Sequence, residues 1–251
     1  MLALISSDVL KLRRRRGMLA LSLLLTAGLM VVAFVVMAIQ HGGNPGTYGP
    51  AGGLDNFRED IGVVTLMALI VGTIIGATAG TQDIESGVFR DLAATGRSRV
   101  ALFASRVAGA WAVVLPILAV TAGLAAAGCV ALAGSLAAPG AGAIAAGTAA
   151  VLVAGALSAA VAVGVSALVG SRGPVIGIML AFYLAVQNLL LAMGFLGGAR
   201  QIVPDAALHR IGDLEPTAGV HVGLGAAILV VVGWSAIALA LGAWRTNTRE
   251  I

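Results

Sequence analysis

DIESGVFRDLAATGRSRVALFASR, from Asp83 to Arg106, is the longest charged stretch of the chain that has a long apolar run on each side. Residues 61–81 before it and residues 107–133 after it contain no charged side chain. Because about 20 apolar residues cross a bilayer as a helix, the sequence predicts a loop between two membrane spans. The loop carries four arginines, which favour the cytoplasmic side. They are Arg90, Arg97, Arg99 and Arg106.

The first half of this loop has the pattern of a short amphipathic helix over residues 84–94. Apolar side chains recur every four residues, as expected for one helical face, and Phe89 flanks them. Glu85 stands near the amino end, where the helix dipole favours negative charge. Two interpretations fit the pattern, a solvated helix at the membrane surface and a docking helix for a soluble partner. The apolar stripe consists of Ile84, Val88 and Leu92.

The composition identifies an integral membrane protein. Of the 251 residues, 59% are hydrophobic and 10% are charged, whereas soluble domains carry about 25% charged residues. The net charge of +4 is typical of basic anchoring on the inner side of a membrane and does not indicate a nucleic-acid partner. Fourteen of the 15 basic residues are arginines. This usage, with the abundance of alanine and glycine, favours a bacterial plasma membrane.

Six apolar runs predict an all-α membrane domain with six transmembrane helices, occupying residues 1–251 as one unit. With both termini in the cytoplasm, the inner segments hold 12 of the 15 basic residues, in agreement with the positive-inside rule. The predicted spans cover residues 17–39, 61–81, 107–133, 141–170, 174–198 and 222–243.

Residues 1–16 predict an amphipathic helix that lies in the membrane interface. Its apolar stripe is Leu2, Ile5, Val9 and Leu12. Asp8 lies on the polar side, with the basic residues that are expected to anchor the helix among anionic headgroups of the membrane lipids. A plain positive-inside anchor is the alternative. The basic residues are Lys11, Arg13, Arg14, Arg15 and Arg16.

Two further features lie inside predicted spans. Gly72, Gly76 and Gly80 are spaced four residues apart, which lets another helix approach closely, whether in this chain or in a second subunit. Gln187 and Asn188 stand near the middle of the fifth span. Polar amides at that depth form interhelical hydrogen bonds or contact a substrate on its pathway, and both alternatives remain open.

The loop resembles the segment between spans two and three of type-2 ABC exporter permeases. The resemblance is carried by Glu85-Ser-Gly87-Val-Phe-Arg90-Asp-Leu92, by Thr95-Gly96-Arg97-Ser98-Arg99, and by Phe103-x-x-Arg106. The chain also ends in Arg249-Glu250-Ile251, similar to many of these permeases. In the family this segment is the coupling helix, which seats in a cleft of the ATP-hydrolysing subunit. The matching positions are Ile84, Glu85, Gly87, Val88, Phe89, Arg90, Leu92, Arg97 and Arg99.

The sequence contains no pattern typical of a catalytic, metal-binding or phosphate-binding site. No predicted span contains Asp, Glu, Lys, Arg or His, and no metal-ligand spacing is present. Cys129 is the single cysteine and fits a packing role. A phosphate-binding motif is excluded because the only lysine, Lys11, has no glycine before it. No catalytic residue and no bound cofactor are therefore expected.

The resemblance implies a permease subunit without ATPase activity, whose partner ATPase subunit binds ATP and Mg²⁺. Six spans are too few to enclose a path, so a second permease subunit, the same or different, is expected. The uncharged spans suggest an amphipathic, lipid-like or drug-like substrate, and the resemblance implies that it is moved outward. Two alternatives remain, a membrane scaffold or assembly protein without transport activity, and a channel that works without ATP.

Overall fold

The computed structural model describes residues 1–88 and 98–248, and in these two ranges the chain forms helices and connecting turns without a strand. Six helical segments within them are long and apolar enough to cross a membrane. The prediction of an all-α, multi-pass membrane protein is confirmed. The six segments are α2–α3 (Arg16–Gly43), α4 (Leu54–Glu85), α6 (Arg99–Ala131), α7 (Ala141–Val169), α8–α9 (Arg172–Ala192) and α11 (Leu224–Thr248).

Two of the six segments are interrupted by a π-helical turn. In the first, η1 (Leu24–Gly28) separates α2 (Arg16–Leu23) from α3 (Leu29–Gly43). In the fifth, η2 (Phe182–Val186) separates α8 (Arg172–Ala181) from α9 (Gln187–Ala192). Such turns insert one residue into the helical repeat. Apolar composition reveals the length of a span but not this local change.

The fifth segment is shorter than predicted, since it ends at Ala192 and not at residue 198. It is followed by η3 (Gly194–Ile202), in which Gly197 has a φ of 52°. This left-handed backbone conformation suits glycine, but the α-helix already ends before it, at Met193, whose ψ of 87° is not helical.

The second and third spans extend further than predicted. α4 begins at Leu54 and α6 begins at Arg99, seven and eight residues before the apolar runs used to predict them. Asp60, Asp83 and Arg106 therefore lie inside helices, and all three are buried. The predicted spans themselves contain no ionisable side chain, but the helices that include them continue into charged residues. A helix can continue through charged residues when they find partners within the protein.

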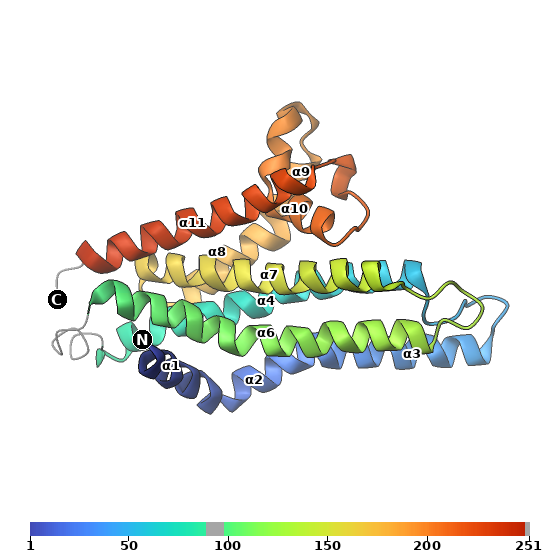
Figure 1. The fold of residues 1–251 in the computed structure, drawn as a ribbon, viewed down its shortest axis with the longest axis horizontal. Coiled ribbons are helices and arrows are strands. Elements are labelled where there is room, and N and C mark those ends of the chain that lie inside the picture. The colour runs from blue at the N-terminus through green and yellow to red at the C-terminus, as the bar shows by residue number, and fades with distance from the viewer. Residues whose placement is uncertain (89–97, 249–251) are drawn as a thin grey trace.

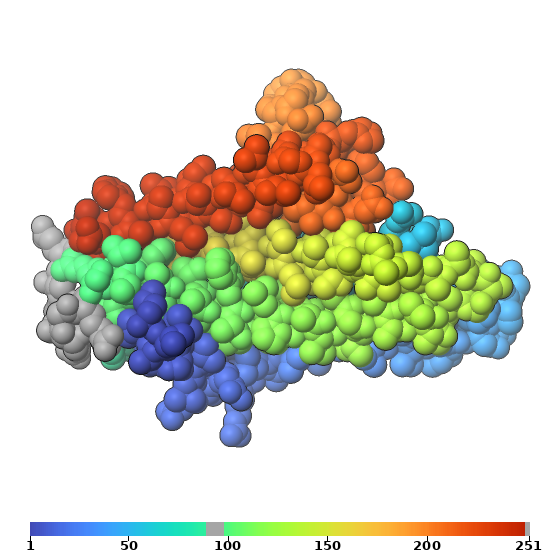
Figure 2. Space-filling model, viewed as in Figure 1, coloured from blue at the N-terminus to red at the C-terminus, as the bar shows by residue number. Residues whose placement is uncertain are grey.

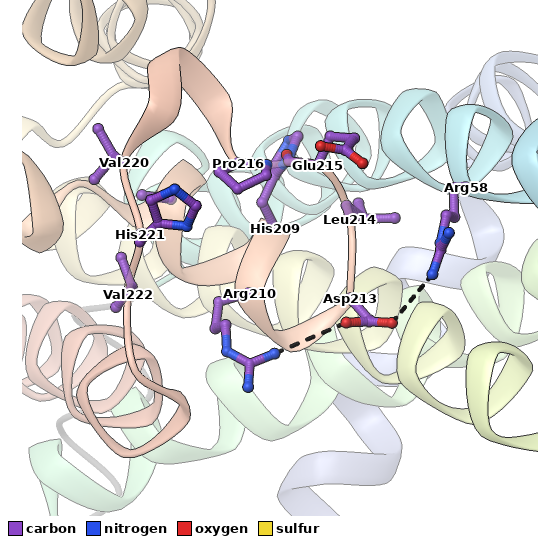
Figure 3. Close-up of a pocket in the computed structure, with 11 residues that line it drawn as sticks. Arg58, His209, Arg210, Asp213, Leu214, Glu215, Pro216, Val220, His221 and Val222 are labelled. Atoms are coloured by element: carbon purple, nitrogen blue, oxygen red, sulfur yellow. Dashed lines mark hydrogen bonds and ion pairs between the residues drawn. The ribbon is translucent and has the colours of Figure 1, made fainter.

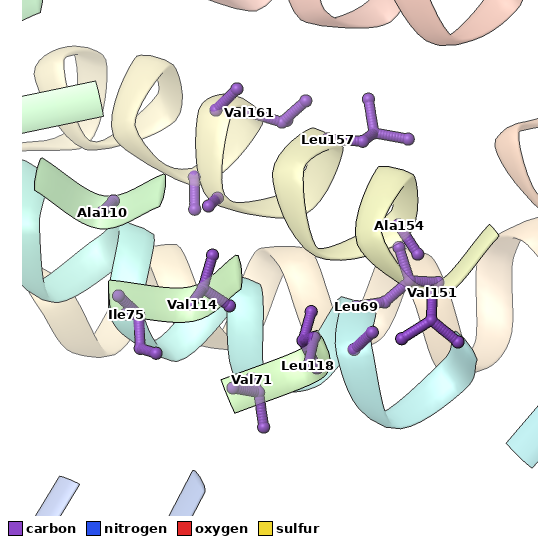
Figure 4. Close-up of a cluster of buried hydrophobic side chains, with 14 of the residues drawn as sticks. Leu69, Val71, Ile75, Ala110, Val114, Leu118, Val151, Ala154, Leu157 and Val161 are labelled. Atoms are coloured by element: carbon purple, nitrogen blue, oxygen red, sulfur yellow. The ribbon is translucent and has the colours of Figure 1, made fainter. Parts of the chain in front are cut away.

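The centre of the bundle is formed by α4, α6 and α7 (Figure 1). Figure 4 shows aliphatic side chains of the three helices meeting there, with Val114 and Leu118 of α6 fully buried. α4 and α7 have 67% and 72% of their most apolar windows buried. The labelled core residues are Leu69, Val71, Ile75, Ala110, Val114, Leu118, Val151, Ala154, Leu157 and Val161.

Gly72, Gly76 and Gly80 lie where α4 contacts α7 of the same chain. A Cβ atom built on Gly76 would be 2.5 Å from the carbonyl oxygen of Ala159, and one on Gly72 would be 2.6 Å from that of Gly155. Only glycine fits such a close approach of two helix backbones. The neighbouring helix, which the sequence leaves open, is thus within this chain.

The remaining helices surround this centre. Figure 1 shows α1 (Leu2–Arg14) near one end of the bundle and α10 (Pro204–Ile211) beside the start of α11. α11 and the first span have only 11% and 17% of their apolar windows buried. α10 starts with Pro204 at its first position, where a proline is tolerated. Val203 precedes it as its N-cap residue, and Asp205 lies in its first turn and does not cap it.

Candidate functional site

The facing ends of α4 and α6 flank residues 86–98, and an ion pair joins these ends. Arg106 Nη2 lies 3.4 Å from Asp83 Oδ2, and the two side chains are 3% and 7% exposed. Arg106 Nη1 also donates to the carbonyl oxygen of Gly80, at 3.4 Å. Because both charges are buried, removing one leaves the other in a poorly solvated position. The pair therefore holds the two helix ends together.

Helix α1 adds two side chains to this pair, Asp8 and Lys11, and α6 adds Ser105. Lys11 Nζ lies 3.0 Å from Asp83 Oδ1 and 3.3 Å from Asp8 Oδ1. Ser105 Oγ donates to Asp8 Oδ2 at 2.8 Å. Each buried carboxylate thus has a cationic partner, and α1, α4 and α6 are joined by one set of contacts. We call Asp8, Lys11, Asp83, Ser105 and Arg106 the charge network.

The orientation of α1 differs from the one predicted. Asp8 was expected on the polar side of an interfacial helix, but it is buried against α6 together with Leu12. Leu2 of the predicted apolar stripe is 83% exposed. A helical pattern separates polar from apolar faces, but it cannot reveal that a carboxylate has a hydroxyl and an ammonium partner on other helices. Gly109 provides the space, since a Cβ there would be 2.9 Å from Asp8 Cβ.

Two more bonds connect the ends of segment 86–98 to other helices. Glu85 Oε1, in the last turn of α4, accepts a hydrogen bond from the backbone N–H of Arg172 at the start of α8, at 2.6 Å. Arg99 Nη1, at the start of α6, donates to the carbonyl oxygen of Asn247 near the end of α11, at 3.1 Å. The base of this one segment is therefore bonded to α1, α8 and α11.

The predicted docking residues divide into two groups. Ile84 and Glu85 belong to the last turn of α4 and do not begin a separate helix. Gly87 follows with a φ of 75°, a left-handed conformation that interrupts the helix, and Val88 is 40% exposed. Phe89, Arg90, Leu92 and Arg97 lie outside the described residues. The docking helix itself therefore stays a prediction.

Gln187 and Asn188 have different environments, although both were predicted as possible pathway residues. Gln187 is 1% exposed, and its Oε1 has no hydrogen-bond partner among the residues that the structure describes. Asn188 is exposed, and its Nδ2 donates to the carbonyl oxygen of Leu184 in the preceding turn, at 3.0 Å. The two residues therefore do not form one polar site.

We predict that Gln187→Leu leaves stability unchanged or raises it by about 1 kcal/mol, because a buried acceptor without a partner is removed. Asn188→Leu is the matched control, since it changes an exposed amide one residue away. The measurement is the thermal midpoint of the purified protein in detergent. A loss of more than about 2 kcal/mol on Gln187→Leu, the range for breaking a buried polar contact, would contradict this prediction.

A pocket with a volume of about 330 Å³ lies near α10, next to the start of α4 (Figure 3). Asp213, whose φ of 52° is unusual for a residue other than glycine, pairs there with Arg58 at 3.4 Å and with Arg210 at 3.9 Å. His209 and His221 also line it. Two arginines and two carboxylates, those of Asp213 and Glu215, line the pocket, so it has no excess of either charge.

Metal binding receives no support from the described residues. In them no group of three His, Cys, Asp or Glu side chains could hold a metal ion. Cys129 is buried, and its Sγ donates to Asp60 Oδ2 at 3.4 Å, so it contributes a polar contact as well as packing.

Among known proteins, no family model matches the chain, and no curated sequence matches it. Its function must be inferred from the charge network, the bonds at the base of segment 86–98 and the pattern of the sequence.

Proposed function

We propose that this chain is the membrane-spanning subunit of an ATP-driven ABC exporter, with segment 86–98 as the part that contacts a separate ATPase subunit. The observation that supports this proposal best is the set of bonds at the base of the segment. Asp83 and Arg106 close the base, Lys11 connects it to α1, and Glu85 and Arg99 connect it to α8 and α11. A force applied to the segment would therefore reach helices throughout the bundle.

The way the helices pack suggests which of them would move. α4 and α7 approach each other at glycines and form a tightly packed centre. α11 and the α8–α9 segment have only 11% and 28% of their apolar windows buried. Both segments are thus far less buried than α4 and α7. Closure of a pair of ATPase subunits, which bind ATP and Mg²⁺, would displace segment 86–98 and tilt α8 and α11 against the centre.

A second permease subunit, the same or different, would complete the pathway between the two chains. The helices at the periphery expose large apolar side chains, including Val32, Leu229 and Ile237, which are 59%, 72% and 64% exposed. Such surfaces suit lipid or another membrane subunit. They also suit a substrate that is amphipathic, lipid-like or drug-like. In this arrangement segment 86–98 and both termini face the cytoplasm of a bacterial cell.

The test is to purify the tagged chain from its native membranes in mild detergent and to assay the preparation for bound ATPase. We expect ATPase activity to copurify with the wild type and to fall at least tenfold with the double reversal Glu85→Arg/Arg90→Glu. Arg58→Glu, at the far end of α4, is the matched control and should retain the partner.

The two alternative functions give different results in the same experiment. If no ATPase copurifies and the reconstituted chain moves an amphipathic dye without ATP, the chain is a channel. If an ATPase binds but substrate never stimulates its activity, the chain is a scaffold. Either result would replace the proposed function.

A further inference from the structure

Four consecutive arginines, Arg13 to Arg16, form the corner between α1 and α2, and all four are exposed. Arg15 ends α1 with a φ of −81° and a ψ of 68°, so the chain changes direction inside the run. Within residues 1–88 and 98–248, none of the four side chains forms an ion pair. Lys11, by contrast, is drawn into the charge network. Of the five residues in the predicted basic anchor, Lys11 therefore belongs to the charge network. The four arginines form no ion pair within the described residues and can contact a ligand.

The position of this corner indicates that it contacts the membrane surface. Arg16 is the first residue of the first segment that could cross a membrane, so the corner lies where the chain enters the bilayer. On the outer face of α1, Leu2 and Leu10 are 83% and 52% exposed. In Figure 2 the dark-blue amino-terminal part of the chain projects from one edge of the molecule. An exposed apolar face beside a cluster of guanidinium groups matches a membrane surface with anionic headgroups.

Few side chains of α1 are buried on its inner side, so a contact on its outer side would stabilise its position. A helix of 13 residues is marginally stable in isolation, and α1 buries only Asp8 and Leu12 fully. One of these is a carboxylate, which gains little from leaving water even when it is paired. The buried groups on its inner side alone therefore stabilise the position of α1 against α6 only weakly.

We propose that the Arg13–Arg16 corner binds the phosphate groups of anionic phospholipids, and that these lipids hold α1 in place so that Asp8 and Lys11 reach Ser105 and Asp83. The guanidinium group forms paired hydrogen bonds with phosphate oxygens, and four such groups at one corner can contact more than one headgroup. This inference does not depend on the proposed transport function, because it concerns the seating of α1 in any membrane that contains such lipids.

The first test measures binding of a fluorescent phosphatidylglycerol to the full-length protein in neutral detergent. Each arginine near an anionic surface contributes roughly a fivefold gain in affinity. We therefore expect Arg13→Gln/Arg14→Gln to weaken binding by at least about tenfold, while the two remaining arginines preserve the membrane orientation. Arg172→Gln/Arg245→Gln removes two other exposed arginines at the same end of the bundle and should change binding little.

Three results would overturn the proposal. They are an equal loss with the control pair, which would indicate general surface charge, equally tight binding of a fluorescent phosphatidylcholine, and complete displacement of the lipid by millimolar inorganic phosphate. The second test measures hydrogen exchange of the α1 amides in nanodiscs. Exchange should be slower in equal parts phosphatidylcholine and phosphatidylglycerol than in phosphatidylcholine alone, and no difference would contradict the role in seating α1.

Discussion

Replacement of Arg106 by methionine is expected to lower the free energy of unfolding by about 3 kcal/mol or more, the range found when one partner of a buried ion pair is removed. Arg106 is 2% exposed and contacts both Asp83 and the carbonyl oxygen of Gly80. After its loss, Lys11, whose side chain is 36% exposed, is the one cationic partner left to Asp83 among the described residues. The measurement is unfolding of the purified protein in mixed micelles with increasing denaturing detergent.

Arg245→Met is the matched control, because it removes an exposed arginine near the end of α11. Its effect should stay within about 0.5 kcal/mol, as for most surface substitutions. The double variant Asp83→Asn/Arg106→Met should lose less stability than the sum of the two single variants, since no buried charge is then left with a reduced set of partners. If Arg106→Met behaved like Arg245→Met, the charge network would have no structural role.

Gly76→Ala is expected to destabilise the protein by about 2 kcal/mol, within the range for overpacking of a tight interior. A methyl group there would be 2.5 Å from the carbonyl oxygen of Ala159 and 2.8 Å from its Cα. Both are backbone atoms, so α4 and α7 can relieve the clash only by moving apart. The same denaturing-detergent titration measures the loss.

Gly62→Ala, in the same helix, is the control for this prediction. No atom lies within 4 Å of a Cβ built on Gly62, so the substitution should stabilise the helix by roughly 0.5–1 kcal/mol through its higher helical propensity. A loss of stability with Gly76→Ala and a gain with Gly62→Ala would support close contact of α4 and α7. Equal effects at both positions would mean that the two helices are not in close contact at Gly76.

The sequence predicts the six spans because a run of about 20 apolar residues is typical of a membrane-spanning helix. The fourth predicted span agrees with α7 to within one residue. It also identifies the glycine spacing on α4. It does not predict that α4 and α6 continue through Asp60, Asp83 and Arg106, because hydropathy equates the end of an apolar run with the end of a helix. The partners of those charges come from other helices, and no local pattern specifies them.

Local sequence patterns also fail to predict most contacts of the charge network. Asp8 and Asp83 are 75 residues apart in sequence, yet both contact Lys11. Sequence spacing could have suggested the Asp8–Lys11 pair, which is three residues apart on one helix. Only the packing of α1 against α6 brings Asp83 and Ser105 to it. The π-helical turn at Phe182–Val186 is likewise invisible in composition.

Contact between segment 86–98 and an ATPase subunit is the central claim, and site-specific crosslinking tests it most directly. Ser86→Cys places an exposed thiol at the first residue of the segment, while Cys129 is buried. Ser135→Cys places one in the turn between α6 and α7 at the opposite end of the bundle (Figure 1). With a short thiol-to-amine crosslinker in native membranes, Ser86→Cys should capture an ATP-binding subunit and Ser135→Cys should not. Capture at neither position, or at both equally, would contradict the claim.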